Sequence, residues 1–238
     1  MSNFVLVHGG YQGAWIWHPT VRCLRAAGHN VYAPTMDGCA ERRHQLRPGI
    51  TVTTQAQEVA DLLFYEDIDD AILVGTSFGG MLISKAAELA RAKLGQNSVQ
   101  RLVYVDALAP QPGETCADIV DRAPDAPYHR LELSQGPPVE DIENRLFVDF
   151  PDDLRAWAVA RYTLHPNGGT DVEPGELDEF WAQSWSASVI NCLQSKNPSN
   201  AHQRRTAEKL NGTYIEMDTG HYPMLTNPED LTQLLIAG

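Results

Sequence analysis

One run of ten residues, 71–80, constrains the fold of this chain more than any other segment. Its first four residues are apolar and indicate a buried strand of a parallel sheet. The next five, Gly75-Thr-Ser-Phe-Gly79, match the pattern G-x-S-x-G, and helix-forming residues follow them. A serine between a strand and a helix stands on a sharp turn whose neighbours pack too closely for side chains. The run therefore predicts an exposed Ser77 hydroxyl at a helix N-terminus, rather than a glycine-rich connection without chemistry.

Short apolar strands alternate with amphipathic segments over much of the chain. This alternation predicts an α/β fold with a doubly wound, mostly parallel sheet. We expect strands at residues 4–7, 29–34, 71–74, 99–105, 188–193 and 213–217. We expect helices at residues 17–27, 54–65 and 80–91, and a last helix from Asn227. Thr54 and Gln57 have the spacing of a capping box at the start of the second helix.

The alternation of strands and helices stops near Pro110. Residues 111–186 are rich in Pro, Asp and Trp, and they contain helical fragments at 139–147 and 151–162 but no clean strand. We interpret this segment as a mainly helical cap inserted over the carboxyl edge of the sheet. Residues 1–110 and 187–238 would then form the core, and 238 residues suffice for one such domain.

Composition narrows the class of protein. A formal net charge of −13 disfavours nucleic acid and anionic membranes as partners. The four cysteines are scattered without metal-like spacing, so we expect free thiols, no bound metal and no cofactor. No basic leader and no apolar stretch of membrane-spanning length is visible. We therefore expect a cytoplasmic protein whose partner is a small molecule, and we leave a homodimer open.

Ser77 needs a base, because a serine hydroxyl is a weak nucleophile unless a neighbouring group takes its proton. Of the eight histidines, His221 is the candidate. It follows the last predicted strand and precedes the last predicted helix. His8 and His18 flank the first loop, and we expect them to be structural or to line a pocket.

The chain resembles the α/β-hydrolase superfamily, and within it the small esterase branch that includes plant methylesterases, hydroxynitrile lyases and bacterial carbamate esterases of the carbendazim type. The resemblance covers nearly the whole chain and rests on Phe4-Val-Leu-Val-His-Gly-Gly10, Gly13-Ala-Trp-Ile-Trp-His18, Ala27-Gly-His29, Gly75-Thr-Ser-Phe-Gly-Gly80 and Gly220-His-Tyr-Pro-Met-Leu225. It implies the order serine, acid, histidine, which places His221 as the base. It also implies that the backbone N–H groups of Gly10 and Phe78 form the oxyanion hole.

The acid of the triad is the open point. Many members of this branch carry an Asp in the segment that here reads Leu193-Gln-Ser-Lys-Asn-Pro-Ser-Asn200, which contains no carboxylate. Asp106 is the best substitute, because it ends the strand that follows the nucleophile helix. The alternatives are Asp218, Asn197, a Ser-His pair without an acid, or a purely structural Asp106 that caps the loop into the cap.

Tyr222 bears on the reaction, because hydroxynitrile lyases of this branch carry a lysine directly after the histidine. A tyrosine cannot supply that charge, so cyanohydrin cleavage is disfavoured. We expect a serine hydrolase that cleaves a small aromatic or apolar ester or methyl carbamate through an acyl-enzyme. Tyr11, Trp181 and Trp185 are predicted to line its pocket. No cluster of Arg or Lys lies near the motifs, so no anionic group on the substrate is expected. A lyase and a non-catalytic small-molecule receptor remain the alternatives.

Overall fold

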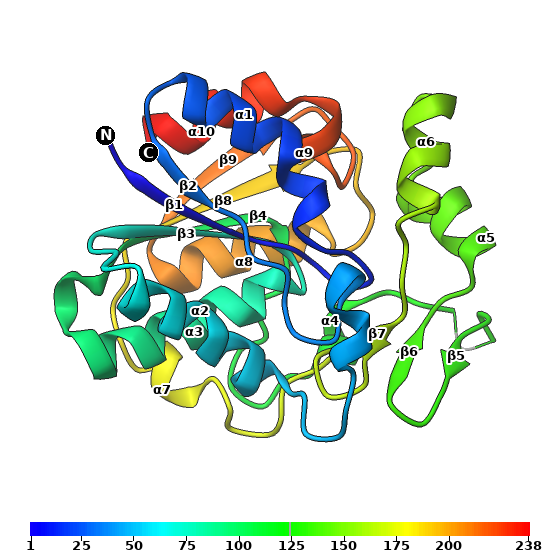
Figure 1. The fold of residues 1–238 in the computed structure, drawn as a ribbon, viewed down its shortest axis with the longest axis horizontal. Coiled ribbons are helices and arrows are strands. Elements are labelled where there is room, and N and C mark those ends of the chain that lie inside the picture. The colour runs from blue at the N-terminus through cyan, green and yellow to red at the C-terminus, as the bar shows by residue number, and fades with distance from the viewer. Residues whose placement is uncertain (124) are drawn as a thin grey trace.

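The computed structural model describes residues 1–123 and 125–238, and a six-stranded parallel sheet forms its centre (Figure 1). The strand order is β2-β1-β3-β4-β8-β9. The strands are β1 (Asn3–Val7), β2 (Asn30–Tyr32), β3 (Ala71–Ser77), β4 (Val99–Ala107), β8 (Ala187–Cys192) and β9 (Thr213–Met217). The order reverses direction between β1 and β3, and open α/β sheets bind ligands at the carboxyl ends of strands at such a point. The predicted fold class is confirmed.

Helices cover both faces of the sheet, and each face has its own apolar core (Figure 1). One face carries α1 (His18–Ala26), α9 (Pro223–Thr226) and α10 (Pro228–Ala237). The other carries α2 (Val52–Tyr65), α3 (Gly79–Leu94) and α8 (Asn200–Leu210). Short 3-10 helices are η1 (Ala14–Trp17), η2 (Ala40–Gln45) and η3 (Gln96–Ser98). Among the described helices, none is both long and apolar enough to cross a bilayer.

The start of α2 differs from its prediction. Thr51, not Thr54, is the N-cap: its side chain accepts a hydrogen bond from the Thr54 amide at 3.2 Å. The Thr54 hydroxyl in turn accepts from the Thr51 amide at 2.8 Å. Gln57 instead donates to Asp61 at 2.9 Å, one turn further along the helix. The predicted capping box is therefore wrong. The pattern favours Glu or Gln at N3, but here a threonine at N3 closes the box equally well.

The segment predicted as a cap contains strands, so the expectation of no clean strand there is wrong. A small antiparallel sheet joins β5 (His129–Arg130), β6 (Ser134–Gly136) and β7 (His165–Pro166). These strands are two or three residues long, too short to show an alternating pattern in sequence. The helices are α4 (Cys116–Ile119), α5 (Val139–Asp141), the π-helix η4 (Ile142–Leu146), α6 (Asp152–Val159) and α7 (Asp178–Trp181).

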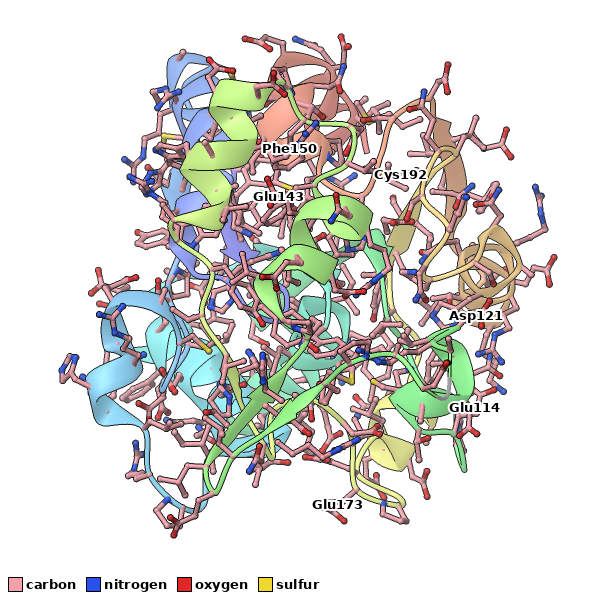
Figure 2. The ribbon with its side chains drawn as sticks, turned by 90° about the vertical axis from the view of Figure 1, so that its right-hand side faces the viewer. Glu114, Asp121, Glu143, Phe150, Glu173 and Cys192 are labelled. Carbon is pink, nitrogen blue, oxygen red and sulfur yellow. The ribbon has the colours of Figure 1, made fainter. Side chains whose placement is uncertain are left out.

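Most of this segment stands beside the carboxyl ends of the sheet strands (Figure 1). Figure 2 looks onto it, with Glu143 on η4, Phe150 between η4 and α6, and Cys192, the last residue of β8, also labelled. Its final portion packs differently. Leu177, Phe180 and Trp185 belong to the core cluster that contains the buried side of α3. The part of the segment free to shape a pocket is therefore shorter than 111–186.

Candidate active site

Ser77 stands on a strained turn between β3 and α3. Its φ angle is 51°, a left-handed conformation that is uncommon for a residue with a side chain. The flanking glycines allow this turn because the backbone packs against itself there. A Cβ on Gly75 would lie 2.4 Å from the Gly79 carbonyl oxygen, and a Cβ on Gly79 would lie 2.6 Å from the Val7 carbonyl oxygen. The strand, turn and helix of the prediction are thus present, and Ser77 is only partly buried.

Asp106 is placed by a bulge in the neighbouring strand. Thr76 pairs with Val105, but Ser77 pairs with Ala107, so Asp106 is one extra residue in β4. Its φ angle of 46° is also left-handed. A bulge of this kind redirects a side chain at the end of a ladder. The strand therefore continues past Asp106 to Ala107, whereas the sequence predicted an apolar strand over 99–105 that closes at Asp106.

Asp106 and His221 meet in the interior. His221 lies between β9 and α9, and its Nδ1 is 2.5 Å from Asp106 Oδ2. Asp106 is fully buried and His221 is 7% exposed, so little water screens the pair. A carboxylate accepts only, so Nδ1 carries the hydrogen and Nε2 is left as the basic nitrogen. No hydrogen bond joins the Ser77 hydroxyl to His221 in the described structure, and in unliganded enzymes this contact often tightens only when substrate binds.

The other candidate acids lie elsewhere. Asp218 accepts a hydrogen bond from Gln194 at 3.0 Å in an exposed position. The Asn197 side chain exchanges hydrogen bonds with the backbone of Asp121 at 3.0 and 3.3 Å. Neither contacts His221 among the described hydrogen bonds. Of the candidates weighed from the sequence, Asp106 is the one that the structure brings to the histidine.

The first loop brings Gly10 against Phe78. A Cβ on Gly9 would lie 2.7 Å from the Ser77 Cβ, and one on Gly10 would lie 2.7 Å from the Phe78 ring. In the described structure neither the Gly10 nor the Phe78 amide N–H donates to a backbone acceptor. Buried His8 fixes the loop, since its Nδ1 bonds to the Gly9 carbonyl at 2.7 Å and its Nε2 accepts from the Met36 amide at 3.0 Å. Burial lowers the pKa of His8 to about 4, which keeps the ring neutral.

Helix α8 supports the chain that follows Asp106. Gln203 donates to the Ala107 carbonyl at 3.0 Å, and the Ala109 amide donates to His202 Nε2 at 3.2 Å. Burial, followed by the nearby Arg205, lowers the pKa of His202 to about 4. The sequence offered no sign of this role, because His202 and Gln203 are almost a hundred residues away from the strand end and match no motif.

Tyr222 is fully buried between the loop that carries His221 and the cap residues Phe147 and Phe150. Its ring is 4.7 Å from the His221 ring in an edge-on arrangement, and it contacts Phe147 and Phe150 at 5.3 and 5.7 Å. Its hydroxyl accepts a hydrogen bond from Gln12 Nε2 at 2.5 Å. Burial raises the pKa of Tyr222, so the phenol stays neutral. The position after His221 therefore supplies a neutral hydroxyl, not a positive charge.

Two cavities are lined by residues at or next to Ser77 and His221. One of about 340 Å³ is lined by His221 together with Asn144, Arg145 and Lys196. The other, of about 520 Å³, is lined by residues that include Phe78 and Tyr11. Of the three residues predicted for the pocket, only Tyr11 lines these described cavities. Trp181 donates to the Pro110 carbonyl at 2.7 Å, and buried Trp185 donates to the Phe180 carbonyl at 2.9 Å.

The two tryptophans were selected for being aromatic and in the cap. In the structure Trp185 belongs to the apolar core that contains α3, and half-buried Trp181 packs against that core. The second cavity is lined instead by residues that the sequence did not single out, including Arg122, Tyr128 and Gln135. In residues 1–123 and 125–238 there is no group of three or more His, Cys, Asp or Glu side chains placed to hold a metal ion.

The chain matches the model of the alpha/beta hydrolase family over residues 4–234. The chain belongs to the alpha/beta hydrolase family. A solved extracellular alpha/beta-hydrolase from a Paenibacillus species, described as sharing structural and functional homology with tobacco salicylic acid binding protein 2, superposes with a TM-score of 0.81. It is 20% identical, and the match covers 100% of this chain and 98% of that one. Polyneuridine aldehyde esterase superposes with a TM-score of 0.77 at 19% identity, over 100% and 98% of the two chains.

Sequence relatives within this family include esterases and a lyase. A carbendazim hydrolyzing esterase from Nocardioides sp. (strain SG-4G) is 38% identical over 52% of this hydrolase and 49% of that esterase. The match thus spans about half the length of that relative. An alpha-hydroxynitrile lyase from Arabidopsis thaliana is 31% identical over 99% of this chain and 96% of the lyase. A putative chloroplastic methylesterase of the same plant is 32% identical over 99% of this chain and 63% of that protein.

Proposed function

We propose that this alpha/beta hydrolase is a serine hydrolase that cleaves a small aromatic or apolar carboxylic ester or methyl carbamate. The observation that carries the proposal is the buried Asp106–His221 pair at the carboxyl edge of the sheet that also carries Ser77. A serine on a strained elbow, a histidine and a buried carboxylate form the constellation that acyl transfer needs. The relatives named as esterases support the same reaction class.

The reaction follows from the roles of these groups. His221 Nε2 takes the Ser77 proton as Oγ attacks the substrate carbonyl, and Asp106 stabilises the positive charge that forms on the imidazole. The Gly10 and Phe78 amides donate to the oxyanion of the tetrahedral intermediate. His221 then returns the proton to the departing alcohol, leaving an acyl group on Ser77. A water molecule deprotonated by His221 releases the acid, or the carbamic acid from a carbamate.

Cyanohydrin cleavage is the rival reaction, because one full-length relative is named as a hydroxynitrile lyase. That chemistry leaves a cyanide anion, which needs a cation nearby. The Tyr222 hydroxyl is neutral and already bonded to Gln12. The residue after His221 therefore favours hydrolysis over the lyase reaction. A non-catalytic receptor on the same fold is the other rival, and it would bind a small molecule without turnover.

The test combines covalent labelling with turnover. The wild type is expected to react with a fluorophosphonate and to hydrolyse p-nitrophenyl acetate. Ser77→Ala should abolish labelling and lower kcat/KM by about 10⁴-fold or more, while Ser184→Ala, an exposed serine, should change neither. Unchanged hydrolysis in Ser77→Ala would exclude the serine mechanism. Labelling without steady turnover of any ester or carbamate would favour the receptor, and release of cyanide from mandelonitrile would favour the lyase.

A further inference from the structure

The larger cavity beside the elbow is lined by two chemically different sets of residues. One set is aromatic and includes Tyr11 and Phe78, the residue that directly follows Ser77. The other set is cationic and consists of Arg122 and Arg130, which stand beside the Tyr128 ring. Its volume of about 520 Å³ is within the range of cavities that enclose a small organic ligand.

Contacts between aromatic side chains connect these two sets of residues. The Tyr11 ring lies 5.9 Å from the Phe78 ring, and the Tyr11 hydroxyl is 3.0 Å from the Tyr128 hydroxyl. The Arg122 and Arg130 guanidinium groups lie over the Tyr128 ring, at 4.5 and 5.0 Å from its centroid. Stacking of this kind holds a guanidinium plane while its N–H edges stay able to bind an acceptor. A ligand in this cavity therefore meets two cationic groups in the same lining as Phe78, the residue next to Ser77.

Neither of these two arginines, Arg122 or Arg130, forms an ion pair within the described part of the chain. Arg122 donates to the Pro127 carbonyl, and Arg130 donates to the neutral Gln135 side chain at 2.9 Å. Two arginines elsewhere in the cap behave differently: Arg145 pairs with Asp141 at 2.7 Å, and Arg155 lies 3.7 Å from Asp152.

One carboxylate, Asp171, does line the same cavity. Its Oδ1 accepts hydrogen bonds from the backbone amides of Cys116 and Val172 at 2.7 and 2.9 Å. This carboxylate is therefore bound by backbone amides, one of which belongs to Cys116, the first residue of α4. Tyr11 adds no charge, because burial raises the pKa of its phenol and keeps it neutral.

We propose that the substrate carries an anionic group, a carboxylate, remote from the scissile ester or carbamate, and that Arg122 and Arg130 bind it. This proposal rests on the proposed function and names its substrate class. It revises the expectation that no anionic group is needed. The sequence could not show it, since these arginines lie outside every motif and reach the cavity only through the fold of the cap.

The test compares two isosteric inhibitors that differ only in charge. 4-(2-Carboxyethyl)phenylboronic acid and its carboxamide both form a tetrahedral adduct with an active-site serine, and the ethyl spacer keeps the boron equally reactive in both. Inhibition of p-nitrophenyl acetate hydrolysis gives their Ki values. The carboxylate should bind the wild type about tenfold more tightly at low salt, and the preference should shrink as salt is added. Equal Ki values, or no inhibition by either compound, would overturn the proposal.

Removing the positive charges of Arg122 and Arg130 tests whether these residues cause the preference for the carboxylate inhibitor. Arg122→Gln and Arg130→Gln should each reduce the tenfold preference, and the double variant should reduce it to about twofold or less. Arg161→Gln is the matched control, because Arg161 also stacks on a cap aromatic ring, Trp157 at 4.1 Å, but does not line this cavity. It should keep the full preference. A preference that survives in the double variant would contradict the assignment to these arginines.

Equilibrium binding separates this proposal from the reaction itself. Methyl 4-(2-carboxyethyl)benzoate can be titrated calorimetrically into Ser77→Ala, and so can the methyl ester in which a carboxamide replaces the remote carboxylate. This binding measurement needs no turnover. Tighter binding of the carboxylate, lost when Arg122→Gln and Arg130→Gln are added, supports the anionic subsite even if the serine mechanism fails. Equal affinity of the two esters for Ser77→Ala, with Ser77-dependent hydrolysis intact in the wild type, overturns the subsite alone.

Discussion

The elbow side and the cap side of the site are built by different means. On the elbow side, Ser77, Asp106 and Tyr11 all have positive φ angles of 51°, 46° and 70°. Within the described cap residues, 111–123 and 125–186, no residue other than glycine has such an angle. There, short strands and aromatic side chains define the cavity. Ser77 and Asp106 are thus held by strained backbone at the edge of a packed sheet. The cap residues assigned to recognition are instead held by side-chain contacts, which substitution can change without disturbing the sheet.

The largest effect should come from removing the charge on the elbow side. Asp106→Asn keeps a side chain that tolerates the left-handed backbone but removes the carboxylate that stabilises charged His221. We expect kcat/KM on p-nitrophenyl acetate to fall by about 10³–10⁴-fold. Asp218→Asn is the matched control, since Asp218 contacts only Gln194 among the described side chains. Its activity should stay within about twofold of wild type. A larger loss for Asp218→Asn than for Asp106→Asn would assign the acid to Asp218.

Alanine substitution of one glycine on each side compares how much free energy of unfolding each region loses when it is overpacked. A Cβ on Gly75 would lie 2.4 Å from the Gly79 backbone oxygen, so Gly75→Ala must move the elbow and should cost about 3 kcal/mol or more. A Cβ on Gly136 in the cap meets only side chains, the Tyr162 hydroxyl at 2.8 Å and the Tyr11 ring at 2.9 Å. Gly136→Ala should cost about 1 kcal/mol. Urea unfolding measures both, and equal losses would show that the cap is packed as rigidly as the elbow.

The elbow side is also the side that the sequence predicted well. The buried strand before Gly75 and the helix after Gly79 are local patterns of a few residues, and they place Ser77 without reference to the rest of the chain. His221 follows from its place between the last strand and helix. Asp106 was selected as the candidate acid, and the structure places it against His221. The bulge that directs its side chain was not predicted, because a one-residue shift in strand pairing leaves no trace in a single sequence.

For the cap, the sequence could predict neither the strands nor the side chains that line the cavity. Its strands are shorter than the window needed to detect alternation, and an aromatic residue in the core looks the same in sequence as one in a pocket. Trp181 and Trp185 were therefore assigned to the pocket, while Tyr128 and Arg122 line it. Which side chains meet there depends on contacts between residues far apart in the chain. Those contacts are set by tertiary packing, and no local propensity encodes them.

Tyr222 couples the two regions, and removing its hydroxyl should have a moderate effect. Tyr222→Phe leaves the buried Gln12 amide without its 2.5 Å partner, which should lower stability by about 1–2 kcal/mol. Because Gln12 lies in the loop that carries Gly10, we also expect kcat to fall by about threefold to tenfold with little change in KM. Tyr104→Phe is the control, since it removes a buried hydroxyl bonded to Ser84 at 2.7 Å. It should lower stability similarly and leave kcat unchanged, and equal kcat losses would argue against coupling.

The smallest effect is a loss of stability in acid, for which one buried histidine from each region is compared. Burial lowers the pKa of His8 in the first loop to about 4, and that of His165 in β7 to about 3. The unfolded chain takes up these protons below about pH 6.5 while the folded protein does not, so stability falls as pH decreases from there toward the folded pKa values. Between about pH 7 and about pH 5.5, each histidine should remove about 1 kcal/mol of stability, measured by urea unfolding. His8→Asn and His165→Gln should each reduce this difference by the same amount. If only His8→Asn reduces it, water reaches His165 through the cap, and the cap opens locally under conditions in which the elbow remains closed.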